Sequence, residues 1–435
     1  MKVGDDSMYL TKIGYRERII DSLIQEHLKT FAAICIEGPK WCGKTWTALN
    51  NSKSVIYIGD PKNNFQNRTL AELNPELVLE GNFPRLIDEW QEVPPLWDAV
   101  RFKVDQSTQK GQFILTGSAT PKRKGILHSG AGRINTLLMR PMSLYESGDS
   151  SGKVSLKDLF YHNFLSTSLT DISLSHLIYL TCRGGWPGSI GLDEKQAINI
   201  TKSYLETIIN DEVVNIDQVL RNKKKIQSLI KSLARNTSTM VSTNTLVNDI
   251  KEFYDDTISS VTISEYLDVL NRIFVIEDQS AFDMNYRSNN RVAKSPKRHF
   301  IDPSLAVAAL DLSSDKLIQD LNFYGFLFES MVIRDLRIYA EALGGKVLHY
   351  KHFDTNVEID AVVELNSGVW GAFEIKLGMN QVDFAAENLL KMQNNIIDSK
   401  KGNPPVFLAV ICGLAQAAYL RSDGVYVIPI TTLKD

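Results

Sequence analysis

The chain has 435 residues, 43% of them hydrophobic, and a formal net charge of -3. This length predicts two or three domains. The small negative charge excludes a general electrostatic attraction to nucleic acid, so such contacts would need local basic clusters. Four scattered cysteines without a C-x-x-C pair argue against a zinc site and against a secreted disulfide framework. No signal-like or membrane-spanning apolar run is present, so we expect a cytoplasmic protein without a membrane partner.

Residues 38–45 form a G-x-x-x-x-G-K-T loop between the apolar run 31–36 and a helix-compatible stretch from Trp46. Glycines let backbone N–H groups surround phosphate oxygens, Lys44 can reach the β- and γ-phosphates, and the Thr45 hydroxyl can ligate Mg2+. The following helix adds its positive N-terminal end. The pattern therefore predicts an ATP site. Its predicted members are Gly38, Pro39, Lys40, Trp41, Cys42, Gly43, Lys44 and Thr45.

An apolar strand over residues 83–87 ends in two acids, Asp88 and Glu89. Asp88 is predicted to hold Mg2+ through water, and Glu89 to polarise the attacking water, which makes the motif one of hydrolysis. A third strand, residues 112–118, ends in Ser118, where a sensor of the γ-phosphate would sit. The alternative for Ser118 is an ordinary turn, because strand ends often carry small hydroxyl residues.

Two arginines, Arg133 and Arg140, precede a break at Pro141. Either is a candidate arginine finger for a neighbouring active site, where it would stabilise the charge of the transition state, and Arg133 is the preferred one. The alternative is a surface arginine paired with a carboxylate. An arginine finger that acts in trans would require a homo-oligomer.

Short apolar strands alternate with helical stretches up to about residue 146, which predicts an α/β fold with a parallel sheet. The turn-rich segment 147–153 ends this part, and mostly helical sequence follows. Four segments are predicted: a P-loop NTPase core (1–150), a helical lid or connector (151–215), a winged-helix-like segment (216–300) and a C-terminal α/β domain (301–435).

The winged-helix prediction rests on the order helix, helix, helix, strand at residues 226–234, 243–253, 259–271 and 273–276. The third helix carries polar groups that could face a DNA groove, although its two carboxylates would repel phosphates. These groups are Ser264, Glu265, Tyr266 and Asp268. A basic loop would then act as a wing on DNA; the alternative is a solvated charge run in a protein-contact module. The loop contains Arg287, Arg291, Lys294, Lys297 and Arg298.

The C-terminal part combines a helix that carries Glu329 with two strands that carry Asp360 and Glu374-Ile375-Lys376. Strand alternation puts Glu374 and Lys376 on one face, so Glu374 can share a metal with Asp360. This set suits metal-assisted hydrolysis of phosphodiesters: Glu329, Asp360 and Glu374 would bind Mg2+ or Mn2+, and Lys376 would orient hydroxide. The alternative is that half-exposed strands commonly alternate acids and lysines.

With these residues assembled, the chain resembles the bacterial and archaeal ATPases that join an AAA+ type domain to a C-terminal domain of unknown function with a restriction-endonuclease-like core. The matching N-terminal segments are residues 15–20 (YRERII), 37–45 (EGPKWCGKT) and 86–89 (LIDE). The resemblance implies that Arg16 or Arg18 lies near the adenine.

The C-terminal acids are similar to the PD-(D/E)XK nuclease signature, with Ile359 at the position of its proline. The resulting prediction is a Mg2+-dependent ATPase that gates a DNA-directed nuclease-like domain, in DNA processing or defence, with Mn2+ as an alternative metal at the C-terminal site. The main alternative is a nucleotide-dependent switch whose C-terminal domain binds a partner and cuts nothing. A third hypothesis is an ATP-driven signalling protein that contacts only other proteins.

Overall fold

The computed structural model describes residues 9–118, 129–168, 172–213, 219, 221–254, 257–284, 295–352, 357–399 and 402–435. The chain forms two compact units. The first runs to Pro141 and takes in Val219 and Arg272–Phe274, and the second begins at Met142. No helix within the described ranges combines the length and apolar character needed to span a lipid bilayer.

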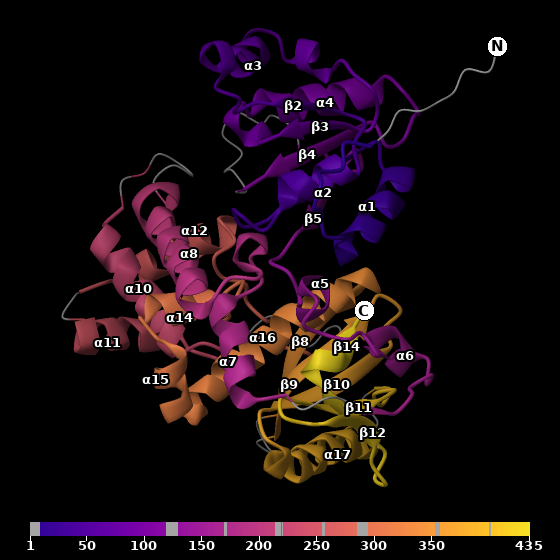
Figure 1. The fold of residues 1–435 in the computed structure, drawn as a ribbon, viewed down its shortest axis with the longest axis vertical. Coiled ribbons are helices and arrows are strands. Elements are labelled where there is room, and N and C mark those ends of the chain that lie inside the picture. The colour runs from indigo at the N-terminus through magenta and orange to yellow at the C-terminus, as the bar shows by residue number, and fades with distance from the viewer. Residues whose placement is uncertain are drawn as a thin grey trace. The chain divides into compact units, whose positions relative to one another are not determined.

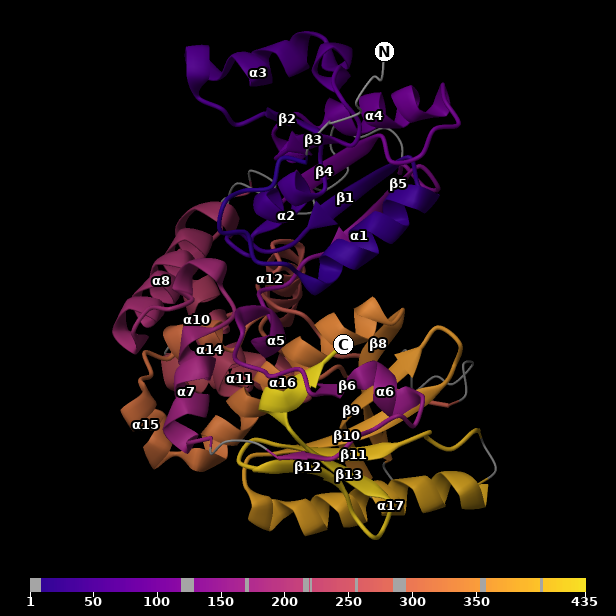
Figure 2. The same ribbon diagram turned by 45° about the vertical axis from the view of Figure 1, so that its right-hand side comes forward.

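The first unit contains one five-stranded sheet in the order β2-β3-β4-β1-β5. Its strands are β1 (Ala33–Glu37), β2 (Ser54–Tyr57), β3 (Arg85–Asp88), β4 (Phe113–Gly117) and β5 (Ile134–Leu138). All neighbouring strands are parallel, which confirms the predicted parallel sheet. Four helices accompany it: α1 (Ile19–Thr30), α2 (Lys44–Asn50), α3 (Lys62–Leu73) and α4 (Pro95–Asp105). Figure 2 shows α1 and α2 on one side of the sheet and α3 and α4 on the other.

Because both faces of this sheet are covered, its strands are continuous apolar runs rather than alternating ones. In β1, Ile34 and Ile36 point to one face and Cys35 to the other, and all three side chains are fully buried. Cys35 packs in a core cluster that includes Val100 of α4. The continuous apolar pattern of β1 is therefore the sequence signature of a central strand.

The strand register brings the chemically important strand ends to one edge of the sheet. Asp88 at the end of β3 lies opposite Thr116 of β4, and Gly117 lies opposite Glu37 at the end of β1. The carboxyl ends of β1, β3 and β4 therefore meet at the same edge, where ligands of open parallel sheets bind.

The second unit contains several helices up to residue 319, of which those at residues 154–272 fall where mostly helical sequence was predicted. They are α5 (Leu144–Ser147), α6 (Leu156–Phe160), α7 (Leu174–Arg183), α8 (Glu194–Thr207), α10 (Lys223–Arg235), α11 (Thr243–Tyr254), α12 (Ser260–Arg272), α14 (Ser304–Ala309) and α15 (Ser314–Gln319). The strand predicted at residues 273–276 is reduced to a single bridge between Ile276 and Phe300, next to a second bridge between Gln279 and Lys297. The winged helix stays a prediction.

A seven-stranded sheet in the order β7-β12-β13-β11-β10-β9-β8 forms the rest of the second unit. Its strands are β7 (Thr167–Ser168), β8 (Gly345–His352), β9 (Val357–Leu365), β10 (Trp370–Lys376), β11 (Leu408–Cys412), β12 (Ala417–Leu420) and β13 (Val425–Pro429), while β6 (Val154–Ser155) pairs with β14 (Leu433–Lys434). The long helices α16 (Leu321–Ala342) and α17 (Val382–Ser399) cover opposite faces of the sheet (Figure 1). The strands β8, β9 and β10 are antiparallel neighbours, as expected for a strand pair followed by the Glu374 strand.

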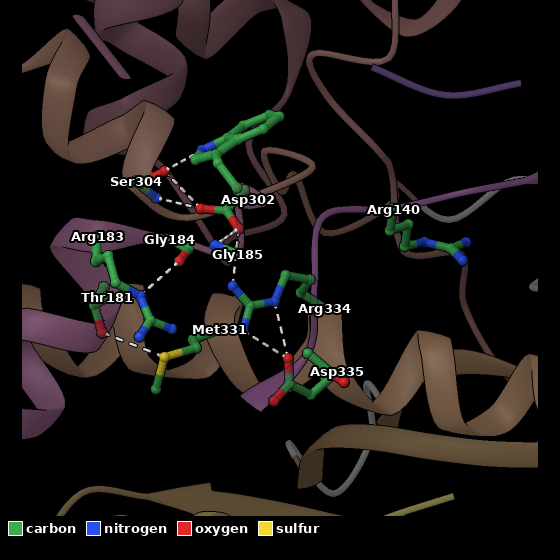
Figure 3. Close-up of polar contacts among 12 residues, drawn as sticks. Arg140, Thr181, Arg183, Gly184, Gly185, Asp302, Ser304, Met331, Arg334 and Asp335 are labelled. Atoms are coloured by element: carbon green, nitrogen blue, oxygen red, sulfur yellow. Dashed lines mark hydrogen bonds and ion pairs between the residues drawn. The ribbon is translucent and has the colours of Figure 1, made fainter. Parts of the chain in front are cut away.

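A buried ionic network lies inside the second unit, centred on Arg334 of α16 (Figure 3). Its guanidinium contacts Asp302 at 2.8 Å and Asp335 at 2.7 Å, and both carboxylates are fully buried. Asp302 also accepts a hydrogen bond from the backbone N–H of Gly185 at 2.9 Å, in the Gly-Gly connection that follows α7. Trp186, which follows the two glycines, is 1% exposed. The network thus holds the backbone conformation of a connection that its two glycines would otherwise leave flexible.

Candidate functional site

The loop between β1 and α2 takes a backbone path that requires glycine at two positions. Gly43 precedes α2 with φ 103°, and Gly38 follows β1 with φ 153°, both in the region that L-residues rarely adopt. A Cβ atom on Gly38 would lie 2.1 Å from the carbonyl oxygen of Met139. The loop is therefore seated against the chain that leaves β5, at the carboxyl edge of the sheet.

We expect Gly38→Ala to abolish ATP binding, because the added methyl group collides with backbone that cannot yield without moving β5. Titration with a fluorescent ATP analogue measures this. Gly59→Ala is the matched control, since a Cβ at Gly59 meets nothing within 4 Å, and it should bind normally. Unchanged affinity in Gly38→Ala would show that the loop tolerates another path.

Lys44 is the first residue of α2 and is only 5% exposed. Its ammonium group donates to the carbonyl oxygens of Gly38 at 2.9 Å and Pro39 at 2.8 Å, so it lies within the curve of the loop. Phosphate oxygens of a bound nucleotide would replace these two acceptors, since they carry charge that carbonyls lack.

Arg18 braces this loop from outside. Its guanidinium donates to the carbonyl oxygens of Cys42 at 2.8 Å and of Arg140 at 2.8 Å, and the residue is 5% exposed. Of the two arginines that the resemblance places near adenine, Arg18 therefore ties the loop to the end of β5, whereas Arg16 is exposed. Arg140 itself is buried at that strand end.

The carboxylate of Asp88 is the centre of the polar contacts at the sheet edge. Its Oδ1 accepts hydrogen bonds from the hydroxyls of Thr45 at 2.9 Å and of Thr116 at 2.7 Å. Burial raises the pKa of Asp88, and the two hydroxyls oppose this rise. Thr45 and Asp88 offer the oxygen ligands that Mg2+ prefers, beside the loop expected to hold phosphates, so the residues fit this ion. Thr116 was not singled out from the sequence.

Glu89 has a left-handed backbone conformation, with φ 58° and ψ 47°, which is uncommon for a non-glycine residue and is often found at functional sites. Its Oε2 accepts hydrogen bonds from the amide of Gln91 and from the hydroxyl of Ser118, the latter at 3.3 Å. Ser118, predicted as a phosphate sensor, thus lies within reach of the candidate water-polarising group. Gln91 was missed, because no motif marks it.

Arg133 lies at the amino-terminal ends of the parallel strands, whereas the P-loop lies at their carboxyl ends. It immediately precedes β5, and its carbonyl oxygen accepts from the N–H of Ala33 at the start of β1. Gly38 lies five positions after Ala33 along β1, which is a distance of about 16 Å at ~3.3 Å per residue. Its side chain is 52% exposed and pairs with Asp105 at 2.8 Å. The structure thus does not bring Arg133 to the P-loop of its own chain; action in trans stays a prediction.

The second unit brings the predicted acids and lysine of its sheet into one cluster. Lys376 of β10 lies 3.1 Å from the Oδ2 atom of Asp360 on β9 and pairs with Glu374 on its own strand. The backbone N–H of Ile375 also donates to Asp360 Oδ2 at 2.9 Å. Glu329 reaches the cluster from α16 through a shared contact with Lys297.

Lys297 is the member of this cluster that sequence reasoning misplaced. Its ammonium group lies 3.0 Å from Glu329 Oε1, 3.1 Å from Glu358 Oε1 and 3.5 Å from Asp360 Oδ1, and the residue is 2% exposed. The prediction that Lys297 contacts DNA in a basic wing is therefore wrong, because three carboxylates inside the protein hold it. The neighbouring Arg298 likewise pairs with Asp278.

The remaining candidates for a DNA contact divide into two groups. Arg287, Arg291 and Lys294 lie outside the described residues. On α12, Ser264, Glu265 and Asp268 are exposed, while Tyr266 is buried and accepts a hydrogen bond from the N–H of Asn222 at 3.3 Å. The exposed face of α12 thus retains the two acids that would repel phosphate.

The pKa values of the clustered acids differ from one another. Burial raises the pKa of Glu374 to about 8 and that of Glu329 to about 7. Burial also opposes ionisation of Asp360, but Lys376 and Lys297 outweigh it and lower the pKa of this carboxyl group. Asp360 is therefore the acid that stays charged, whereas Glu374 mostly keeps its proton near neutral pH.

This donor set does not fit a divalent metal. A carboxyl group that binds a metal must be deprotonated and must turn its oxygens to the ion. The carboxyl groups of Glu329, Asp360 and Glu374 instead contact ammonium or amide groups of the protein. Among the described residues, no group of three or more His, Cys, Asp or Glu side chains is arranged to hold a metal ion. The geometry speaks against the metal-ligand roles predicted for Glu329, Asp360 and Glu374.

Comparison with known proteins divides the chain into three matched regions. Residues 30–148 match the family model described as AAA domain. Residues 174–316 and 324–433 match two models described as domains of unknown function, DUF8612 and DUF4143. The latter models assign no activity, so the nuclease resemblance of the C-terminal part stays a prediction.

Curated relatives and solved structures resemble the chain at low identity. Uncharacterized protein Rv2008c of Mycobacterium tuberculosis (strain ATCC 25618 / H37Rv) is 23% identical over 347 residues, which cover 79% of this chain and 70% of that protein. The Walker-type ATPase paby2304 of Pyrococcus abyssi has a TM-score of 0.42 and 15% identity, and the match covers 69% of this chain and 97% of that chain. The Aeropyrum pernix Orc1 protein in complex with DNA has a TM-score of 0.27 and 14% identity, and the match covers 73% of this chain and 97% of that chain.

The functional assignment of the first unit rests on agreement between the family model and the local geometry. The glycine loop, the buried Lys44 and the hydroxyl-bonded Asp88 all lie at the carboxyl edge of one parallel sheet. Residues 30–148, which contain this edge, match the AAA domain model and carry the geometry of a P-loop.

Proposed function

We propose that the first unit hydrolyses ATP with Mg2+ and alternates between ATP-bound and ADP-bound states. The observation that carries this proposal is the contact between Asp88 and Thr45, which joins the acid-bearing strand to the P-loop at 2.9 Å. Thr45 and Asp88 would hold the ion, which when bound neutralises the charge that develops on the phosphates. Lys44 supplies a second positive charge on the same groups.

Glu89 is the residue proposed to polarise the attacking water. Its carboxylate accepts hydrogen bonds from Gln91 and Ser118. A γ-phosphate at the loop offers a competing acceptor for these donors, so their release would leave Glu89 available to take the proton of water. Gln91 and Ser118 act here as positioning residues, because they reach the reaction through Glu89.

Lys44→Ala should abolish ATP turnover, because it removes the buried ammonium that meets the β- and γ-phosphates. Release of inorganic phosphate measures this. Lys103→Ala is the matched control, since the side chain of Lys103 is 39% exposed and pairs with the surface acid Glu80 at 3.8 Å. Undiminished turnover in Lys44→Ala would remove the P-loop from the reaction.

For the second unit, we favour the non-cleaving alternative: the ATPase acts as a switch, and the C-terminal sheet domain binds a partner. Its support is the pairing of the candidate acids with lysines, which satisfies their charge internally. A nuclease coupled to the ATPase is the second candidate, supported by the presence of Glu329, Asp360, Glu374 and Lys376 in one cluster.

Cleavage assays separate these candidates. Linear, single-stranded and branched DNA are incubated with Mn2+, with and without ATP, using the intact chain and Asp360→Ala. The switch predicts no cleavage by either protein while ATP is hydrolysed. Cleavage by the intact chain that Asp360→Ala loses would establish the nuclease instead. DNA retention at low salt, where phosphate contacts are strongest, tests whether the partner is nucleic acid or protein.

A further inference from the structure

The ammonium group of Lys297 lies at the point where three acids of the cluster converge. A lysine has three N–H donors, and Lys297 has three carboxylate partners: Glu329 at 3.0 Å, Glu358 at 3.1 Å and Asp360 at 3.5 Å. These partners come from α16 and β9, so the lysine cross-links a helix and a strand. Its donors are matched by acceptors without any other ligand.

The backbone holds Lys297 in this position. It exchanges two hydrogen bonds with Gln279, at 2.9 Å and 3.0 Å. The side-chain amide of Gln279 in turn donates to the carbonyl oxygens of Leu348 and Asp360, each at 3.0 Å. Gln279 is fully buried. Lys297 therefore enters the cluster from a segment that is paired with Gln279, and Gln279 is in turn hydrogen-bonded to β9.

The charges of the cluster are nearly balanced by lysines alone. Four acids are present, of which Glu374 mostly keeps its proton near neutral pH, and three ammonium groups contact them. The acids are Glu329, Glu358, Asp360 and Glu374, and the lysines are Lys297, Lys351 and Lys376. A Mg2+ ion binds carboxylate oxygens at about 2.0–2.1 Å. Such an ion and the Lys297 ammonium would need the same space, and both are cations.

We propose that Lys297 is a built-in cation that occupies the position of a divalent metal, so that the C-terminal domain takes no metal at this cluster. The lysine stabilises the converging acids permanently, in place of an exchangeable ion. This inference rests on the non-cleaving form of the proposed function and deepens it. It does not involve the P-loop, so its failure and the failure of ATP hydrolysis are separate results.

Mn2+ titration of the full chain by calorimetry, without nucleotide, tests the inference. The wild type and Asp360→Asn should give superimposable titrations, because neither holds Mn2+ at the cluster. Lys297→Met, whose side chain is one atom shorter and uncharged, should gain a Mn2+ site that the wild type lacks, with an affinity at least about tenfold above any weak Mn2+ binding of the wild type. The gain should vanish in Lys297→Met/Asp360→Asn. Lys297→Arg is the matched control and should gain nothing.

Each outcome decides the inference. A Mn2+ site in the wild type that Asp360→Asn removes would overturn it, as would a folded Lys297→Met that gains no site. The far-UV circular dichroism spectrum reports whether Lys297→Met folds. Should it not fold, the comparison of wild type with Asp360→Asn still decides. Weak Mn2+ binding at Asp88 is expected equally in every variant, so it does not affect the differences between their titrations.

Discussion

Glu89→Gln is expected to lower ATP turnover by about 10²–10⁴-fold, the usual contribution of a positioned acid or base, while ATP remains bound. Glutamine keeps the size of the side chain and still contacts Ser118, so the left-handed turn at residue 89 can form. It cannot take a proton from water. Phosphate release in a single turnover measures the chemical step, and retention of labelled ATP on the protein measures binding.

Glu92→Gln is the matched control for this experiment. Glu92 lies three residues further along the same turn and contacts Arg68 at 3.3 Å, and its side chain is 45% exposed. The control should turn over ATP normally, because a surface ion pair contributes little. Normal turnover in Glu89→Gln would transfer the water-polarising role to another acid, and loss of ATP binding would mean that Glu89 shapes the site instead.

The P-loop and the parallel sheet of the first unit could be predicted because their signals are local. The spacing of Gly38, Gly43 and Lys44 encodes a loop within eight residues, and the apolar runs beside it encode central strands. The cluster of Asp360, Glu374 and Lys376 was likewise readable from strand alternation. Glu374 and Lys376 are two positions apart on one strand, and Asp360 lies on the adjacent antiparallel strand, which precedes it directly in the chain.

The rest depends on pairings between distant segments. Thr116 contacts Asp88 only because β3 and β4 are in one particular register. Lys297 is 63 positions from Asp360 in the chain and sits in a sequence of basic residues, so its local context indicated a solvated loop. The position of Arg133 could have been inferred, since a residue before a parallel strand lies at the edge opposite the P-loop.

The chain enters the second unit through a segment fixed by buried polar contacts. The backbone N–H of Met142 donates to the carbonyl oxygen of Gly185 at 2.6 Å, and that of Leu144 to Asp335 Oδ2 at 3.0 Å. Asp335 is held by Arg334. The Arg334 network therefore anchors the first residues of the second unit.

Arg334→Met should destabilise the second unit by roughly 3–5 kcal/mol, because it leaves Asp302 and Asp335 buried without their cation. Both carboxylates are fully buried, so water cannot compensate them. Urea unfolding followed by circular dichroism measures the change. Arg421→Met is the matched control: Arg421 pairs with Asp383, which is 90% exposed, and its loss should cost no more than about 1 kcal/mol. A loss for Arg334→Met as small as the control's would mean that Asp335 is neutralised by a proton rather than by the arginine, since burial already raises the pKa of Asp335 to about 6.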